Sequence, residues 1–210
     1  MGGTFDPIHN GHLVAASEVA SAFKLDEVVF VPTGSPYLKE QVTPAEHRYL
    51  MTVIATASNP RFKVSRIDID RGGDTYTVDT LRELRAEWPT RPLCLLLGMD
   101  AFLGLPGWRE WERIVELAHL VVAHRPGWQM PAEGVLGALL ANRATRVVRD
   151  LHAAIAGRVH VHAVTQLEIS STGLRDIIVS GRDPRFLVSE PVREIIRDTG
   201  CYARHGRSPR

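Results

Sequence analysis

Hydrophobic and polar positions follow two different periods along the chain. Short apolar runs, such as residues 27–31 and 93–97, alternate with segments whose apolar residues recur every three or four positions. Apolar runs of this length are typical of strands buried on both faces, and the longer spacing is typical of amphipathic helices. Their alternation predicts an α/β fold: a Rossmann-like, doubly wound, mainly parallel sheet with a small helical C-terminal extension.

The same pattern assigns most of the chain to elements. Strands are expected at residues 27–31, 62–69, 93–97, 120–123 and 159–164, and helices at 11–23, 44–58, 77–87, 108–117, 136–151, 171–179 and 189–198. Pro32 should stop a strand, Pro44 should lie in the first turn of a helix, and Thr77 could cap one. We expect a single domain over residues 1–202, with its helical part from about 171, and a disordered basic tail at 203–210.

Composition narrows the classes of protein that fit this fold. The 25 basic and 24 acidic residues give a formal net charge of +1, which disfavours bulk nucleic-acid binding. The two cysteines lack metal-ligand spacing, and no run of residues is apolar enough for a membrane helix or a signal peptide. We therefore expect a cytoplasmic protein without nucleic-acid or membrane partners.

The most informative segment is the first one. Residues 2–12 read Gly-Gly-Thr-Phe-Asp-Pro-Ile-His-Asn-Gly-His. The glycines let the backbone approach a ligand, and the helix expected from Gly11 directs its free N–H groups toward the same turn. His9 and His12 can both reach one anion there. The spacing of the two histidines could also hold zinc, but no third ligand follows at a familiar offset, so a phosphate site is favoured.

A second segment offers hydroxyls and amides at a helix N-terminus. Residues 169–175 read Ile-Ser-Ser-Thr-Gly-Leu-Arg, which places Arg175 one turn into the helix. Alone, such a segment is more often a simple helix cap. Together, however, the two segments resemble the motifs of the HxGH nucleotidyltransferase superfamily. The resemblance implies an ATP site formed by Gly3, Thr4, Phe5, His9, His12, Ser170, Ser171, Thr172 and Arg175.

Further segments resemble bacterial nicotinate-nucleotide adenylyltransferases over nearly the whole chain. They are Pro-Thr-Gly-Ser-Pro-Tyr-Leu-Lys at 32–39, Asp-Thr-Tyr-Thr at 74–77, Gly-Met-Asp at 98–100, the tryptophan at 108 and Arg-Pro-Gly at 125–127. The resemblance implies that Arg125 helps to hold ATP and that Trp108 stacks on the pyridine ring. The implied mononucleotide pocket comprises Thr4, Lys39, Tyr76, Thr77, Gly98, Asp100 and Trp108.

Two positions depart from the pattern of that family. Leu38 stands where a histidine is commoner, which affects the contact that the loop makes. Arg109 follows the expected stacking tryptophan where several relatives have tyrosine. Its guanidinium could approach the nicotinate carboxylate, or it could face solvent.

The resemblance implies adenylyl transfer from ATP to nicotinate mononucleotide, giving deamido-NAD and pyrophosphate in NAD biosynthesis. The catalytic residues implied are His9, His12, Lys39 and Arg175, which share the negative charge of the phosphates. The sequence has no dedicated carboxylate cage, so Mg²⁺ is expected to arrive with ATP and no protein metal site is expected.

Several alternatives stay open at this point. The chain could be another superfamily member, such as pantetheine-phosphate adenylyltransferase or a cytidylyltransferase, although Trp108 and Tyr76 argue against these. It could prefer nicotinamide mononucleotide, since the two pyridine rings differ only in carboxylate against amide. It could also be a non-catalytic nucleotide sensor. Monomer and homo-oligomer are both compatible with the sequence.

The start of the chain departs from a complete doubly wound fold. Such a fold begins with a strand of five or six residues that leads into the Gly-Gly turn, but here Met1 directly precedes Gly2. Because this first strand is central in a Rossmann-like sheet, its neighbours would lack ladder partners. We expect the strand to be encoded upstream of Met1.

Overall fold

The strands of the protein are parallel and form two three-stranded sheets. The computed structural model describes residues 1–36, 42–124, 130–165 and 167–203. One sheet has the order β1 (Gly2–Gly3), β2 (Val28–Pro32), β3 (Phe62–Val64), and the other has the order β4 (Cys94–Gly98), β5 (His119–His124), β6 (Val159–Ala163). The expected Rossmann-like α/β fold is confirmed.

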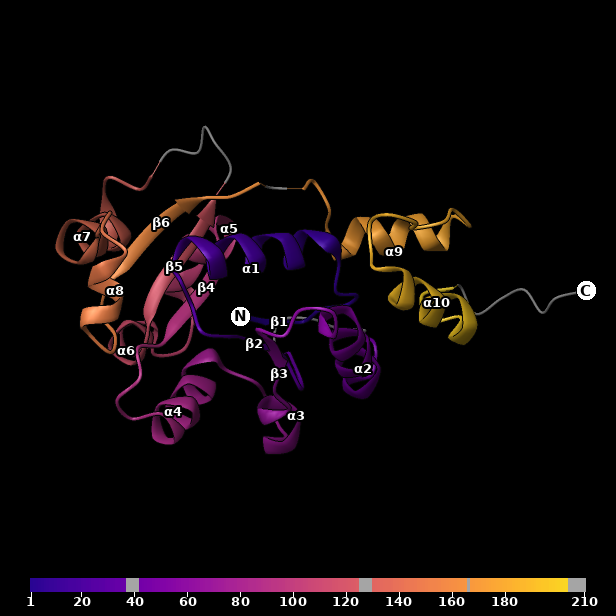
Figure 1. The fold of residues 1–210 in the computed structure, drawn as a ribbon, viewed down its shortest axis with the longest axis horizontal. Coiled ribbons are helices and arrows are strands. Elements are labelled where there is room, and N and C mark those ends of the chain that lie inside the picture. The colour runs from indigo at the N-terminus through magenta and orange to yellow at the C-terminus, as the bar shows by residue number, and fades with distance from the viewer. Residues whose placement is uncertain (37–41, 125–129, 166, 204–210) are drawn as a thin grey trace, which may run out of the picture.

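Helices cover both sides of these strands. In Figure 1, α1 lies above β1, β2 and β3, and α3 and α4 lie below the strands, while α9 and α10 lie at the end of the molecule opposite α7 and α8. No helix in the described ranges has the length and apolar character needed to cross a bilayer. The helices are α1 (Asn10–Ala22), α2 (Ala45–Thr56), α3 (Ile67–Arg71), α4 (Thr77–Glu87), α5 (Met99–Leu103), the 3₁₀ turn η1 (Leu105–Gly107), α6 (Trp111–Leu117), α7 (Gly134–Arg143), α8 (Arg149–Ala153), α9 (Ser171–Val179) and α10 (Glu190–Thr199).

The hydrophobic core consists of two clusters, one on each face of β4 and β5. Leu96 and Val121 belong to the cluster that also contains buried residues of α1, α9 and α10. Leu95 and Leu97 belong to the cluster on the other face, together with Val78 of α4. Adjacent strand residues point to opposite faces, so both faces are apolar and buried. This burial explains why these strands are continuous apolar runs in the sequence.

The sheet is divided next to β1. This strand has only two residues, which pair with β2 in the register Gly2 to Val31 and Gly3 to Pro32. Among the described residues, no strand ladder joins β1 to β4. The division lies where the sequence predicts a longer first strand. The expectation about residues upstream of Met1 stays a prediction.

The strand expected over residues 62–69 is wrong beyond Val64. The alternation of Ile67, Asp68 and Ile69 is typical of a strand, yet these residues belong to the short helix α3. Burial is the reverse of what the pattern indicates, because Asp68 is the buried member of this segment. Its carboxylate accepts hydrogen bonds from Thr80 of α4 and from Arg71 of the same short helix, and the tertiary contact with Thr80 outweighs the local pattern.

Two expected helices also differ from the structure. Residues 108–110 precede α6 as an irregular segment, and Glu110 has a left-handed backbone with φ 49°. The segment 136–151 is not one helix but lies in α7 and α8, because the chain between them bends toward β6, where Thr145 N–H donates to the carbonyl of Val159 at 2.9 Å. An apolar periodicity does not reveal such a break.

Three local expectations are corrected by smaller shifts. Pro44 is the N-cap residue of α2 rather than part of its first turn, and Tyr76 rather than Thr77 is the N-cap residue of α4. Pro32 ends β2 as expected, but it is the last residue of the strand and not the first residue after it. A proline is tolerated there because β3 already ends at Val64, opposite Phe30, so no partner needs its missing N–H.

Candidate active site

The Gly-Gly turn is shaped by the aromatic ring that follows it. Phe5 is buried and has a left-handed backbone with φ 48°, and the peptide bond between Asp6 and Pro7 is cis. A Cβ on Gly3 would lie 2.8 Å from the Phe5 ring, so only glycine fits at that position. Phe5 also presents its ring edge-on to His12, with 5.1 Å between the centroids. The turn therefore holds the second histidine in place.

The two histidines lie against one another at the start of α1. His9 is the N-cap residue, and its backbone N–H donates to Nδ1 of His12 at 3.2 Å. The two rings stack with centroids 3.6 Å apart. Because Nδ1 of His12 accepts a hydrogen bond, the neutral ring carries its proton on Nε2. Gly11 makes room for the pair, since a Cβ there would lie 3.0 Å from Nδ1 of His9.

His9 is nearly enclosed, with 6% of its surface exposed. Burial lowers its pKa from 6.5 to about 4, so the imidazole is neutral near pH 7. Its Nδ1 atom is buried and has no hydrogen-bond partner among the described residues. A buried polar atom without a partner is costly, so this nitrogen is a candidate for a contact with a ligand that enters the turn. Near pH 7 His9 thus presents a neutral polar group to the cavity and not a cation.

The second motif is bonded directly to the first. Ser170 caps α9 by accepting a hydrogen bond from Gly173 N–H at 3.0 Å, so the simple capping interpretation is also correct. Ser171 Oγ donates to the carbonyl of Pro7 at 2.9 Å. Arg175 Nη1 donates to the carbonyl of Asp6 at 2.7 Å, and its Nη2 donates to Thr172 Oγ1. These bonds place the N-termini of α1 and α9 beside one turn.

One cavity of about 1200 Å³ is lined by this turn, by the predicted pyridine pocket and by residues of β2 and β4 such as Val29 and Leu95. The predicted residues that line it are Gly3, Thr4, Phe5, His9, His12, Tyr76, Thr77, Gly98, Trp108, Ser170, Ser171, Thr172 and Arg175. Asp100 lies in the first turn of α5 and is not one of the lining residues. Lys39 and Arg125 lie outside the described residues.

Arg48 is a structural residue of the site that the sequence interpretation missed. Its side chain is 1% exposed and donates three hydrogen bonds to loop carbonyls, to Thr4 at 2.7 Å, Thr43 at 2.8 Å and Gly34 at 2.9 Å. Burial lowers the pKa of the guanidinium, which nevertheless stays charged. A signal for it existed in the sequence. Arg48 lies on the same face of α2 as the buried Met51 and Ala55, and an arginine within an apolar stripe indicates a specific partner.

Asp6 was also missed, and it connects three distant segments. Its carboxylate accepts hydrogen bonds from Tyr202 Oη at 2.7 Å and from Thr43 N–H at 3.3 Å. Burial raises the pKa of the Tyr202 hydroxyl well above its usual value, which keeps this group protonated as a donor. No local pattern in the sequence predicts a bond between residues 6 and 202. The contact becomes visible only in the folded chain.

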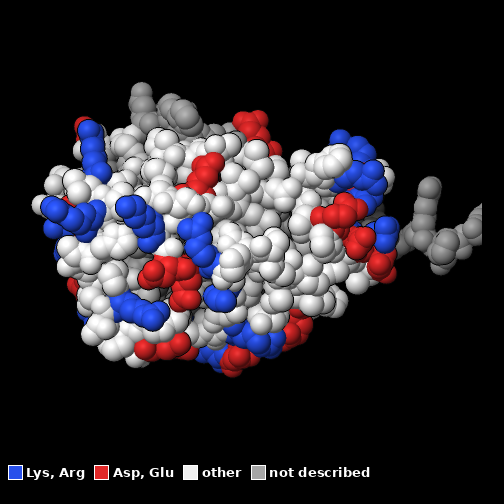
Figure 2. Space-filling view, in the orientation of Figure 1, with Lys and Arg blue, Asp and Glu red and all other residues white. Residues whose placement is uncertain are grey.

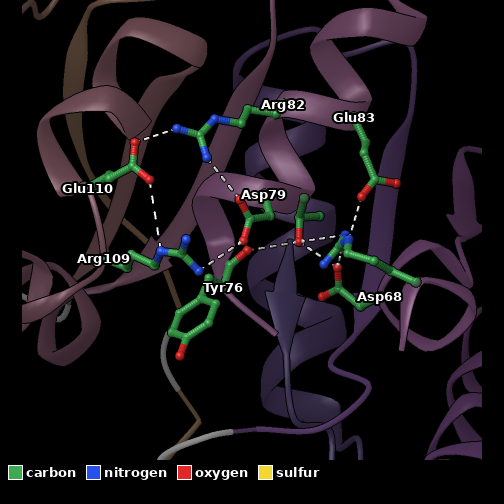
Figure 3. Close-up of polar contacts among 9 residues, drawn as sticks. Asp68, Tyr76, Asp79, Arg82, Glu83, Arg109 and Glu110 are labelled. Carbon is green, nitrogen blue, oxygen red and sulfur yellow. Dashed lines mark hydrogen bonds and ion pairs between the residues drawn. The ribbon is translucent and has the colours of Figure 1, made fainter. Parts of the chain in front are cut away.

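A further buried network positions the start of α4. In Figure 3, Asp68 lies among the side chains that join α3 to α4. Arg71 donates to its carboxylate at 2.8 Å, and the Thr80 hydroxyl donates to the same oxygen. Burial is the main influence on Asp68 and raises its pKa. Gly34 is required nearby, because a Cβ there would lie 2.4 Å from the carbonyl oxygen of Asp68.

Positive charge at the site is local. On the face drawn in Figure 2, basic and acidic side chains are interspersed and do not gather by sign. Two helix N-termini and Arg175 instead converge at the Gly-Gly turn, and helix N-termini with an adjacent arginine bind phosphate. Ligands of open α/β sheets bind at this carboxyl edge of the strands. The fold and this site define an α/β nucleotidyltransferase.

Comparison with known proteins gives the family. The family model described as cytidylyltransferase-like matches residues 1–177. A protein of Corynebacterium jeikeium named "Probable nicotinate-nucleotide adenylyltransferase" is 51% identical over 206 residues, which cover 96% of this chain and 98% of that protein. A protein of Leifsonia xyli with the same name is 51% identical over 202 residues, covering 96% of this chain and 92% of the relative. The chain belongs to the family of nicotinate-nucleotide adenylyltransferases.

A solved structure supports the fold. The Plasmodium falciparum nicotinic acid mononucleotide adenylyltransferase, complexed with NaAD, superimposes with a TM-score of 0.74. The alignment covers 96% of this chain and 94% of that one at 17% sequence identity. At this level of identity the likeness concerns the fold alone. The resemblance inferred from the motifs is confirmed by the curated relatives.

Proposed function

We propose that this chain transfers the adenylyl group of ATP to the phosphate of nicotinate mononucleotide. A phosphate oxygen of the mononucleotide attacks the α-phosphorus of ATP, the bond from that phosphorus to the bridging oxygen breaks, and pyrophosphate leaves. The products are deamido-NAD and pyrophosphate. The proposal rests chiefly on the hydrogen bonds that join the two phosphate motifs beside a cavity that Trp108 and Tyr76 also line.

The chemistry needs alignment and charge neutralisation more than acid–base catalysis. The attacking phosphate is already an anion at neutral pH, so no general base is required. His9 offers an uncharged nitrogen, His12 offers its Nε2 proton, and Arg175 offers a cation held by the Asp6 carbonyl. In our proposal Lys39 and Arg125 add charge to the phosphates.

We propose that Mg²⁺ enters with ATP and is not held by a dedicated protein site. Within the described ranges there is no group of three or more histidine, cysteine, aspartate or glutamate side chains placed to hold a metal ion. The carboxylate inside the first phosphate motif, that of Asp6, is already bonded to Tyr202 and Thr43. Mg²⁺ commonly keeps several waters and binds through substrate phosphates.

We also propose that residues 1–202 act as one domain, since buried residues of α1, α9 and α10 share one hydrophobic cluster.

Pyrophosphate release with a panel of acceptors tests this function. The purified protein is given ATP, Mg²⁺ and one of nicotinate mononucleotide, nicotinamide mononucleotide or phosphopantetheine, and the nucleotide product is identified by mass. We expect the highest kcat/KM with nicotinate mononucleotide. A higher value with another acceptor, or ATP binding without any pyrophosphate release, would contradict the proposal.

A matched pair of variants connects the activity to the site. Loss of one donor to a developing charge typically costs about 10²–10³ in turnover, so His12→Ala should lose that much. His47→Ala makes the same change at an exposed position of α2 and should retain full activity. Thermal unfolding of both variants checks that they remain folded.

A further inference from the structure

A short irregular segment brings Arg109 next to the predicted pyridine site. Trp108 ends the 3₁₀ turn η1, and Glu110 precedes α6 with a left-handed backbone, φ 49° and ψ 44°. That conformation is uncommon for a residue other than glycine and often occurs near functional sites. Trp108 and Arg109 both line the cavity. The segment therefore presents an aromatic ring and a cation side by side.

The guanidinium of Arg109 is oriented by stacking. Its Cζ atom lies 4.7 Å from the centroid of the Tyr76 ring, a distance that suits a cation–π contact. Tyr76 is the N-cap residue of α4 and lines the same cavity. Figure 3 shows Arg109 reaching from its own segment across to Tyr76 and Asp79 of the neighbouring helix region. The plane of the guanidinium is thus held before any ligand arrives.

The carboxylates near Arg109 are bound more closely by another arginine. Arg82 donates to Asp79 at 2.9 Å and forms a short hydrogen bond with Glu110. Arg109 lies 3.7 Å from Asp79 and 3.9 Å from Glu110, which are ion-pair distances too long for hydrogen bonds. Within the described part of the chain, Arg109 donates no hydrogen bond, and its side chain is 52% exposed. Its N–H groups remain available to a ligand.

We propose that Arg109 determines specificity for a carboxylate on the pyridine ring, an inference that rests on the proposed function. A carboxylate accepts two parallel hydrogen bonds from a guanidinium, whereas a carboxamide has no charge and only one acceptor oxygen. With Arg109 present, the two arginines balance the charges of Asp79 and Glu110. Without it, the carboxylate loses a charged, two-bond partner, whereas the amide loses no charged contact. Arg109 therefore favours nicotinate mononucleotide over nicotinamide mononucleotide.

The test compares two arginines of the same network. Arg109→Gln, Arg109→Lys and Arg82→Gln are assayed for kcat/KM with nicotinate mononucleotide and with nicotinamide mononucleotide. Arg82 shares both carboxylates but does not line the cavity, so it is the matched control. Because solvent screens a charged pair at a half-exposed site, we expect Arg109→Gln to lower kcat/KM with nicotinate mononucleotide by only about tenfold. The kcat/KM of Arg109→Gln with nicotinamide mononucleotide should stay constant or rise. Arg109→Lys should have values between those of the wild-type protein and Arg109→Gln.

Two results would overturn this proposal. One is an equal loss with both mononucleotides in Arg109→Gln, and the other is an equal change of the specificity ratio in Arg82→Gln, which would indicate a purely structural network. Dissociation constants for the two mononucleotides, measured from Trp fluorescence, keep the test independent of turnover. If the wild-type protein releases no pyrophosphate, the proposed function fails. Arg109 is then judged by whether Arg109→Gln selectively weakens binding of nicotinate mononucleotide.

Discussion

Replacing Gly11 with alanine should separate the geometry of the site from the stability of the fold. The added Cβ would lie 3.0 Å from Nδ1 and 3.2 Å from Cε1 of His9, but 3.7 Å from the carbonyl of Leu167. Non-bonded contacts of this kind are most favourable at about 3.5–4.0 Å. The His9 ring must therefore move by about 0.5 Å while it is stacked on His12.

The expected result is a loss of activity without a loss of folding. A displacement of about 1 Å can cost about 10²-fold in rate, so about 0.5 Å should cost about tenfold in kcat/KM. Stability should change by less than about 1 kcal/mol, because alanine is the better helix former by about that amount and offsets the crowding. Pyrophosphate release gives the first quantity, and urea unfolding gives the second.

The control is Gly104→Ala, at the C-cap of α5. A Cβ there would meet only ordinary contacts, of 3.5 and 3.7 Å, so both quantities should match the wild-type protein. Wild-type kcat/KM in Gly11→Ala would refute the reasoning. A stability loss above about 2 kcal/mol would refute it as well, because the crowding would then act on the fold and not on the His9 ring alone.

Two further predictions concern stability. Arg48→Met leaves three partly buried loop carbonyls without their donor and should cost about 3 kcal/mol in urea unfolding; a cost below about 1 kcal/mol would contradict the role given to this residue. The second prediction follows from the pKa of His9, which is lowered from 6.5 to about 4. As the pH falls, the unfolded chain binds a proton at His9 at a higher pH than the folded chain does. The contribution of His9 to the free energy of unfolding is therefore fully present above pH 6.5 and is lost as the pH drops from 6.5 to 4. His9→Asn should lack this part of the pH dependence, so between pH 6.5 and 4 its free energy of unfolding should fall by up to about 3 kcal/mol less than that of the wild-type protein. Parallel curves of unfolding free energy against pH for the two proteins would disagree with the prediction.

The helices and strands that could be predicted are those in which local burial alone determines the pattern of hydrophobic and polar residues. The strands at β4 and β5 are continuous apolar runs because both faces are buried. The helices at α1 and α4 start and end within one residue of the expected positions, since amphipathic spacing dominates there. The contiguous residues from Gly2 to His12 form one turn and one helix start. Local information is sufficient for such segments.

The incorrect assignments arise where a distant contact decides the local structure. Asp68 is drawn inward by Thr80 and Arg71, so an alternating segment becomes a helix. Glu110 adopts a left-handed backbone at a position where it pairs with Arg82 of α4. Thr80 lies 12 residues from Asp68 and Arg82 lies 28 residues from Glu110, whereas Arg71 is only three residues from Asp68. A pattern of hydrophobic and polar positions contains no information about these pairings.

The candidate site also contains residues that the sequence predicts and residues that only the folded structure reveals. Residues implied by the motifs, such as His9, Arg175 and Trp108, line one cavity in the structure. The residues that hold them could not be derived from the motifs. Asp6 lies inside the first motif, yet its bonds to Thr43 and Tyr202 depend on the position of the complete chain around it. Arg48 was the exception, since its place on a buried helix face was readable.

The connections of Asp6 have a consequence for how the site assembles. Its carboxylate and carbonyl together receive hydrogen bonds from Thr43, Arg175 and Tyr202, and buried residues of α9 and α10 belong to the same cluster as those of α1. The residues lining the pyridine end pack against the other cluster, with β4 and α4. Opening of the C-terminal helices would therefore remove Arg175 and leave Trp108 and Tyr76 in place. The phosphate half of the site depends on contacts between the two ends of the chain, whereas the pyridine half depends on contacts within its middle.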